Sequence, residues 1–258
     1  MEDYYGVKLF DRISRKLYLT ENGRRALQYA RHIIDLLDEM EQGVRDVDAM
    51  GRLKVGTSIT IGTYLLPGYI KKLKQQYPAL KVEASIANSG TIEQQILDND
   101  IDVGIIEGVA HSPFILSESF AGDRLVFICP AGHEFAGKTL EELSEVRNQD
   151  FILREKGSAG REIFDGILAA QELNVRPIWQ SASNQVILQG VKAGLGISIL
   201  PYFLVRQDIR EGELAEFRIK DLALNRKYSV IYHKNKFLPR SARTLMELCK
   251  EGNGADRL

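Results

Sequence analysis

Along residues 52–250, short apolar runs alternate with stretches whose apolar residues have helical spacing. This alternation predicts the secondary structure of most of the chain. Short runs rich in Val, Ile and Leu are typical of buried strands, and each leads into a stretch with helical spacing. Strands are expected at 53–57, 81–86, 102–106, 124–129, 150–154, 176–181, 197–200 and 228–232. Helices are expected at 63–76, 91–98, 160–172, 184–193 and 239–250. Strands that alternate with helices predict an α/β sheet architecture.

The N-terminal part shows a different pattern. Residues 7–20 are expected to form a hairpin, because an apolar strand at 7–10 and a second strand that alternates at Leu17 and Leu19 flank a basic tip. Thr20 then suits the N-cap position of a following helix.

A heptad pattern marks that helix, which we expect over residues 21–50. Its apolar positions are spaced 4, 3, 4, 3, 4 and 3 residues apart: Ala26, Ala30, Ile33, Leu37, Met40, Val44 and Val47. The mean period of about 3.5 residues is typical of a coiled coil. An amphipathic helix lying on its own domain is the alternative. So narrow a seam favours a partner helix, and a homodimer through this helix is expected.

Composition narrows the class of protein. The chain has 258 residues, enough for about two globular units, with 44% hydrophobic and 27% charged residues. These ordinary values exclude a disordered or collagen-like chain. No apolar run reaches the roughly 18–20 residues of a membrane helix, and no signal peptide is evident. Two cysteines are too few for a disulfide framework. We therefore expect a cytoplasmic protein without a membrane partner.

The net charge of −1 conceals a local asymmetry. Residues 12–31 hold six basic side chains and one acidic side chain, whereas residues 35–48 hold six acidic side chains and one basic side chain. A basic patch is thus followed directly by an acidic helix face.

Several stretches are similar, in order, to those of LysR-type transcriptional regulators. They are Gly6–Arg12, Arg15–Gly23, Thr57–Gly62 with Leu65–Pro67, Asp102–Ile105, and Gly190–Ile197 with Leu200–Pro201. Each stretch alone is a weak signal, but the ordered set covers the whole chain. The chain therefore resembles a LysR-type regulator.

This resemblance implies the domain organisation. Residues 1–20 would be the remaining wing of a winged helix-turn-helix, and residues 21–50 a dimerising linker helix. A two-lobed α/β effector domain, similar to periplasmic binding proteins, would follow. Its first subdomain would comprise 52–121 and 223–258, and its second 122–222. The family likeness also implies a homotetramer on double-stranded promoter DNA.

One departure from the family concerns DNA. The wing begins at about residue 7, so roughly 35–40 residues that would hold the recognition helix are missing. Because that helix reads the bases, we expect the chain as given not to read DNA specifically. Either the true start lies upstream, or this is a shortened regulator. Arg12, Arg15 and Lys16 are candidates for phosphate or minor-groove contacts, which position a protein on DNA without specifying sequence. A solvated basic hairpin is the alternative.

Candidate effector contacts lie where strands give way to helices, since ligands of open α/β folds bind there. Three groups qualify: Ser58 and Thr60; Ser158 and Arg161; and Ser183, Asn184 and Gln185. Hydroxyls and free N–H groups at helix starts suit a small anion. Simple helix capping is the alternative for each group.

Other chemistry is not expected. The four histidines show no metal-ligand spacing, and no phosphate-binding glycine loop or nucleophile elbow is present. We therefore expect no metal, no cofactor and no enzyme activity. The competing function classes are a stand-alone cytoplasmic small-molecule-binding protein of the two-lobed fold, and an enzyme built on that fold.

Overall fold

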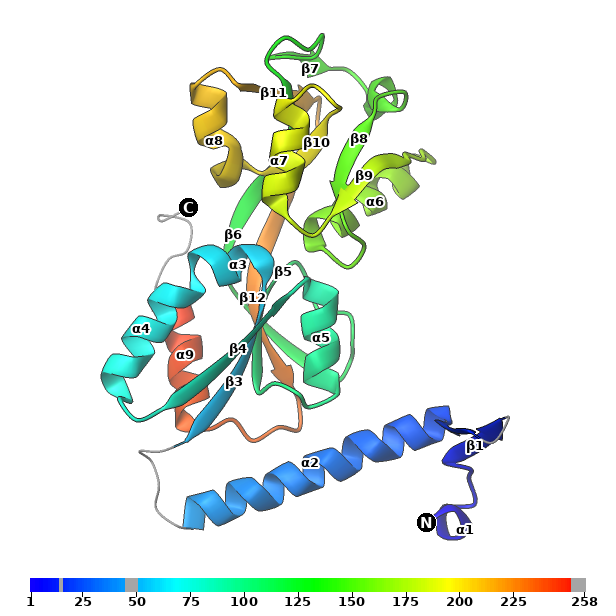
Figure 1. Ribbon diagram of the computed structural model, residues 1–258, viewed down its shortest axis with the longest axis vertical. Coiled ribbons are helices and arrows are strands. Elements are labelled where there is room, and N and C mark those ends of the chain that lie inside the picture. Colours follow the sequence, from blue (N-terminus) through cyan, green and yellow to red (C-terminus); the bar gives the residue numbers. More distant parts are fainter. Residues whose placement is uncertain (14–15, 45–50, 252–258) are drawn as a thin grey trace.

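The computed structural model describes residues 1–13, 16–44 and 51–251. An N-terminal arm lies beneath two lobes (Figure 1). The arm consists of α1 (Glu2–Tyr5), the hairpin strands β1 (Phe10–Ile13) and β2 (Lys16–Leu19), and the long helix α2 (Glu21–Val44).

The N-terminus of α2 forms as the sequence predicts. Thr20 Oγ1 accepts the Gly23 N–H at 2.9 Å, which confirms the expected cap. Three residues of the predicted seam, Ile33, Leu37 and Met40, are 58%, 52% and 57% exposed. Val47 lies outside the described residues. No described part of the chain covers these three residues, whereas Ala26 and Ala30 of the same seam are half-buried.

Lobe I, the lobe next to α2, is a five-stranded sheet with helices on both faces. Its strands run in the order β4-β3-β5-β12-β6. They are β3 (Arg52–Ser58), β4 (Lys81–Ala87), β5 (Val103–Glu107), β12 (Asn225–His233) and the first part of β6 (Ile115–Pro130). Its helices are α3 (Ile59–Tyr64), α4 (Leu66–Gln76), α5 (Ser89–Leu97) and α9 (Arg240–Glu251).

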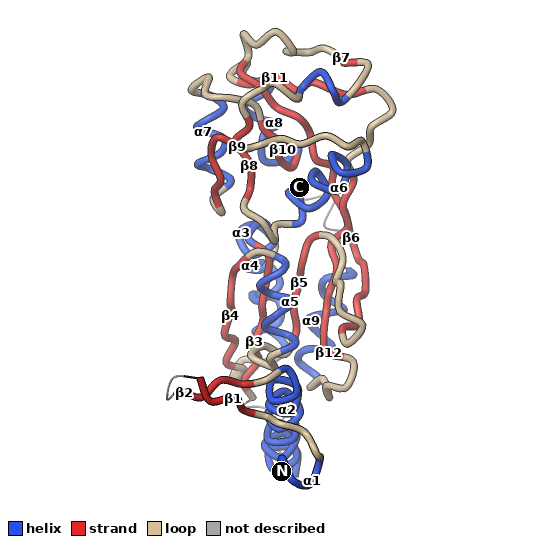
Figure 2. The backbone as a smooth tube through the Cα atoms, turned by 90° about the vertical axis from the view of Figure 1, so that its right-hand side faces the viewer, coloured by secondary structure: helices blue, strands red, loops and turns tan. Residues whose placement is uncertain are grey.

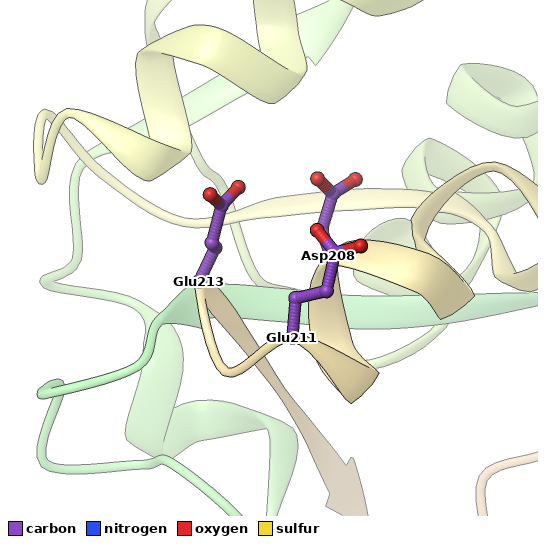
Figure 3. Close-up of side chains that lie close together, drawn as sticks. All are labelled: Asp208, Glu211 and Glu213. Carbon is purple, nitrogen blue, oxygen red and sulfur yellow. The ribbon is translucent and has the colours of Figure 1, made fainter.

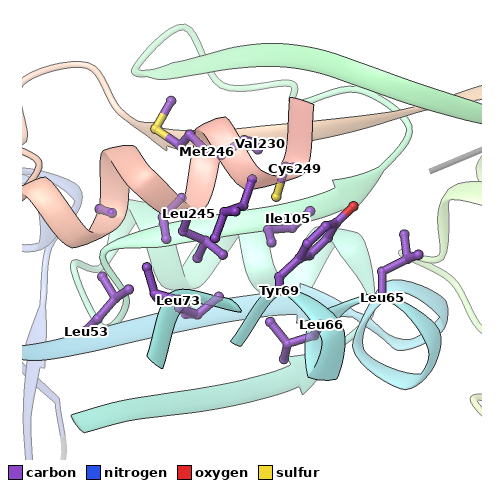
Figure 4. Packing of buried hydrophobic residues seen from close by; sticks show 14 of the residues in the cluster. Leu53, Leu65, Leu66, Tyr69, Leu73, Ile105, Val230, Leu245, Met246 and Cys249 are labelled. Atoms are coloured by element: carbon purple, nitrogen blue, oxygen red, sulfur yellow. The ribbon is translucent and has the colours of Figure 1, made fainter. Parts of the chain in front are cut away.

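The main core of lobe I lies between this sheet and the α4–α9 pair. Leu53, Leu73 and Leu245, from β3, α4 and α9, meet there with no exposed surface (Figure 4). Ile92 and Ile96 of α5 fill a smaller cluster with Ile106 of β5. Both faces of the sheet are therefore covered, as expected for parallel strands in an α/β fold.

Lobe II is built around the last part of β6. Two strands, β10 (Ser198–Pro201) and β11 (Leu214–Ile219), pair antiparallel with it. The remaining strands are β7 (Thr139–Leu140), β8 (Phe151–Arg154) and β9 (Pro177–Ser181), the last two pairing in parallel. The helices are α6 (Ala159–Ala170), α7 (Asn184–Lys192), α8 (Tyr202–Arg210) and a 3-10 turn (Leu143–Val146).

One unbroken strand joins the lobes. β6 pairs with β12 from Ile115 to Arg124, and then with β10 and β11 from Leu125 to Pro130. Figure 2 shows β6 running along the molecule from one lobe into the other. The strand expected at 124–129 is therefore only the last part of a 16-residue strand.

Two further expectations need correction. The first strand of the hairpin, expected at 7–10, is β1 (Phe10–Ile13). The single helix expected at 63–76 is two helices, α3 and α4, which meet at Leu65. Pro67 stands in the first turn of α4, where a missing N–H group costs no helical bond. Neither α8 nor β11 was expected. No helix among the described residues is long and apolar enough to cross a membrane.

Candidate functional site

A cavity of about 400 Å³ lies between the lobes. Lobe I contributes Ile59, Thr63 and Tyr64 of α3 to its wall. Lobe II contributes the remaining lining residues, which are Ala182, Ser183, Asn184, Gln185, Leu188, Leu200 and Leu204. A largely apolar wall with a few polar groups is typical of small-molecule sites. Three of the predicted residues, 183–185, therefore share one cavity wall.

The polar part of that wall is fixed by a buried arginine that the sequence analysis missed. Arg154, at the end of β8, donates from Nη1 to Asn184 Oδ1 at 2.9 Å. Its Nε and Nη2 donate to the two carboxylate oxygens of Glu155 at 2.8 and 3.1 Å. The Arg154 side chain is only 8% exposed. The sequence feature that could have identified Arg154 is its position as a basic residue at the end of an apolar strand.

The contact with Arg154 determines which group Asn184 offers to the cavity. A guanidinium only donates, so the amide must turn its oxygen toward Arg154. The Nδ2 group makes no hydrogen bond to the described residues and remains a free donor. The cap of α7 is Ser183 rather than Asn184, since the Ser183 hydroxyl accepts the Val186 N–H at 3.4 Å.

Ser158 and Arg161 lie elsewhere. Ser158 is buried at the N-cap of α6 without a side-chain capping bond. The Arg161 Nε donates to Asp165 Oδ1 at 2.7 Å, and its Nη1 donates to the Arg154 carbonyl at 3.1 Å. Neither residue lines the cavity, and the Arg161 charge is partnered within lobe II.

Three hydroxyls of lobe I are buried without a hydrogen-bond partner in the described structure: those of Thr57, Ser58 and Thr60. Ser58 is the N-cap of α3, yet its side chain caps nothing. Ile59, which stands between two of them, lines the cavity. Unpaired buried polar groups are rare and costly, so this cluster is where a ligand or ordered water would supply the missing bonds.

The lobes contact each other at separate places. The rings of Tyr64 and Phe203 meet edge to face at 5.3 Å. The Gly90 N–H donates to the Gly157 carbonyl at 3.0 Å, and His111 Nε2 lies 2.5 Å from Glu162 Oε1. The two lobes are therefore in direct contact in this structure.

The predicted DNA contacts lie on the hairpin. Lys16 is exposed at the start of β2, and Arg12 lies on β1. The Arg12 side chain and the whole of Arg15 lie outside the described residues.

One group of carboxylates in the described part of the chain could hold a cation: Asp208, Glu211 and Glu213 (Figure 3). Lys192 pairs with both Asp208 and Glu213, the latter at 2.5 Å. Hydrogen bonds to these two carboxylates raise the pKa of Lys192. The lysine ammonium thus pairs with two of the three carboxylates, and Glu211 accepts a hydrogen bond from Gln207 at 2.8 Å, so each carboxylate has a partner within the protein.

The comparisons agree on one family. The model of the LysR substrate binding domain matches residues 48–254. The uncharacterised HTH-type transcriptional regulator YeiE of Escherichia coli is 34% identical over 255 residues, covering 98% of this chain and 85% of YeiE.

Two solved structures share the fold. One is the regulatory domain of CcmR from Synechocystis PCC6803 in complex with 2-PG, with a TM-score of 0.70 and 24% identity over 79% of this chain and 98% of that one. The other is the effector binding domain of QuiR in complex with shikimate, with a TM-score of 0.69 and 15% identity over 81% of this chain and 100% of that one. The two-lobed effector-domain fold implied by the sequence resemblance is thereby confirmed.

Proposed function

Because the chain belongs to the family of LysR-type transcriptional regulators, we propose that a small anion bound between its lobes controls how its subunits are arranged on promoter DNA. The observation that carries this proposal is the donor group at the cavity wall. Asn184 presents a free Nδ2 group because Arg154 holds its oxygen. Such a donor favours ligands that carry acceptor oxygens.

The neighbouring groups support the same ligand class. The Ser183 hydroxyl accepts from Val186, which leaves its proton free for a ligand, and Gln185 is exposed at the same wall. The buried cations beside the site are already neutralised, Arg154 by Glu155 and Arg161 by Asp165. The anion would therefore be held by hydrogen-bond donors and by the N-terminus of α7 rather than by a free positive charge.

Closure of the two lobes around the ligand would be the movement through which ligand binding regulates the protein. A ligand shifts an equilibrium only by its difference in affinity for the two states. Contacts from both lobes exist together only in the closed arrangement, so a ligand that uses both binds that arrangement more tightly. The Ser58 and Thr60 hydroxyls are proposed as the lobe I contacts, and Ser158 and Arg161 as supporting positions behind the lobe II wall.

The exposed residues of α2 support a proposal for the assembly. We propose a homodimer through its exposed seam, and a homotetramer of two such dimers. Lys16, with Arg12 and Arg15, would contact DNA phosphates near the hairpin. The protein would act in the cytoplasm as a sensor, without catalysing a reaction.

Calorimetry on the full chain tests the ligand class. Sulfate, phosphate and small carboxylic acids are titrated beside uncharged compounds of similar size. For an acid that binds, Asn184→Leu should weaken binding about 10- to 100-fold, as expected for a lost hydrogen bond to a charged group. Gln189→Leu, an exposed position on the same helix, is the matched control and should leave the affinity unchanged. Binding of only cationic or apolar compounds would contradict the proposal.

A further inference from the structure

His111 of lobe I stands between carboxylates of both lobes. Its Nδ1 lies 3.1 Å from Glu93 Oε2 on α5, and its Nε2 lies 2.5 Å from Glu162 Oε1 on α6. Ionised carboxylates only accept hydrogen bonds, and a neutral imidazole donates from one nitrogen only. Both contacts are therefore satisfied at once only when the ring is protonated.

Glu93 holds the ring in place independently of lobe II. Its Oε1 accepts the backbone N–H groups of His111 and Ser112 at 2.8 and 2.7 Å. The Glu93 side chain is only 11% exposed, whereas that of Glu162 is 50% exposed. When the lobes separate, the ring stays with Glu93 and the contact with Glu162 is the one that breaks.

The loop that carries His111, residues 108–114, brings no other charged side chain to the ring. The charged groups that face it are Glu93 from α5 and Glu162 from α6. The bridge therefore links the lobes through a single histidine placed between one carboxylate of each lobe.

We propose that His111 is a proton-dependent bridge between the lobes, which favours the closed cleft when its ring is protonated and releases lobe II when the ring is neutral. This proposal rests on lobe closure as the regulatory movement of the proposed function. It adds a second input, the proton, at a place separate from the ligand cavity, since none of the three residues lines that cavity.

The direction of the effect follows from linkage. The hydrogen bond with Glu93 raises the pKa of His111, partial burial opposes it, and the charge and hydrogen bond of Glu162 raise it further. The contribution of Glu162 exists only when the lobes touch, so the pKa is higher in the closed state than in the open state. The bridge is complete below the open-state pKa and is lost as pH rises through the closed-state pKa. Because His111 and Glu162 are half exposed, we expect a two- to five-fold change in the ratio of closed to open molecules.

The test measures closure directly in the effector-free full chain. Cysteines introduced by Gln75→Cys in lobe I and Lys138→Cys in lobe II, both exposed positions, carry a pair of labels, while Cys129 and Cys249 are buried. The distance between the labels is followed from pH 5.5 to 9. The closed fraction should fall as pH rises, and His111→Gln and Glu162→Gln should each remove this dependence. NMR titration should show a lower pKa for His111 in the Glu162→Gln protein.

His133→Gln is the matched control. His133 contacts Gln149 within lobe II and bridges no lobes, so its loss should leave the pH dependence intact. An unchanged pH curve in Glu162→Gln, or a wild-type distance that does not respond to pH, would overturn the proposal. Since no effector is added, failure of anion binding in calorimetry leaves this result unaffected, and the two proposals fail separately.

Discussion

Arg226 of β12 and Asp123 of β6 face each other where the two strands run side by side. Nε and Nη2 of Arg226 lie 2.6 and 2.7 Å from the two carboxylate oxygens of Asp123. Glu107 Oε2 lies 3.2 Å from Nη1, and the Tyr228 hydroxyl donates to Asp123 at 2.8 Å. Burial disfavours the charge, yet the charges of Glu107 and Asp123 raise the pKa of Arg226. A buried ionic group thus ties β6 and β12 together.

Replacement of Arg226 should strongly destabilise the folded protein. Arg226→Met leaves Asp123 and Glu107 buried without their counter-ion, and the free energy of unfolding should fall by about 3–5 kcal/mol. Denaturation with urea measures the change. Arg218→Met is the control, because the Arg218 side chain is 69% exposed and a surface substitution should change stability by no more than about 0.5 kcal/mol. Equal losses in the two variants would contradict this account.

Both thiols should be inert in the folded protein. Burial raises the pKa of Cys129 to about 11 and that of Cys249 to about 12, so neither is a thiolate near neutral pH. A thiol reagent at pH 8 should leave both unmodified until denaturant is added, and should then react with two thiols per chain. Rapid modification of either cysteine in the folded state would show that its cluster opens.

Replacement of two glycines by alanine should change the free energy of unfolding in opposite directions. Gly166 is an exposed residue inside α6, and an added Cβ meets nothing within 4 Å. Gly166→Ala should raise the free energy of unfolding by about 0.5–1 kcal/mol. At Gly196 the added Cβ would lie 2.4 Å from the Asp150 carbonyl oxygen. Gly196→Ala should therefore destabilise the protein by about 1–3 kcal/mol. Thermal unfolding of the two variants, compared under one condition, checks the opposite signs.

The exposed seam of α2 predicts the oligomeric state. Leu37→Glu places a charge in the middle of the seam and should shift the full chain toward monomer. Arg24→Glu, on the opposite face of the helix, should leave the mass unchanged. Light scattering during size-exclusion chromatography measures both. A wild-type chain that is already monomeric would instead favour the stand-alone binding protein.

Local sequence patterns predicted those helices and strands whose first and last residues are marked by a change of pattern or by a glycine. The helix expected at 184–193 is α7 (Asn184–Lys192), because an apolar strand precedes it and Gly194, at a φ of +78°, follows it. β6 was underestimated for a physical reason. Its residues 116–124 are exposed or only partly buried, so they lack an apolar run, and the strand there is formed by pairing with β12.

The sequence likewise predicted those residues of the candidate site that a local pattern marks, but not the contacts between distant residues. Residues 183–185 were found because they follow a strand and begin a helix. The role of Arg154 depends on a contact with Asn184, which is 30 residues away in the sequence. The bridge at His111 joins residues 18 and 51 positions apart. Such contacts form only in the tertiary structure, so neither the periodicity of apolar residues nor the spacing of motifs predicts them.

The position of β12 has a consequence for synthesis. It lies between β5 and β6 in the sheet of lobe I, although it is the last strand of the chain. When β11 (Leu214–Ile219) emerges from the ribosome, all helices and strands of lobe II are outside it, whereas lobe I still lacks a central strand and α9. Since domains generally fold as units during translation, we expect lobe II to be able to fold before lobe I is complete. A premature stop near residue 220 would leave every strand of lobe II but would remove β12 and α9, a central strand and a covering helix of lobe I.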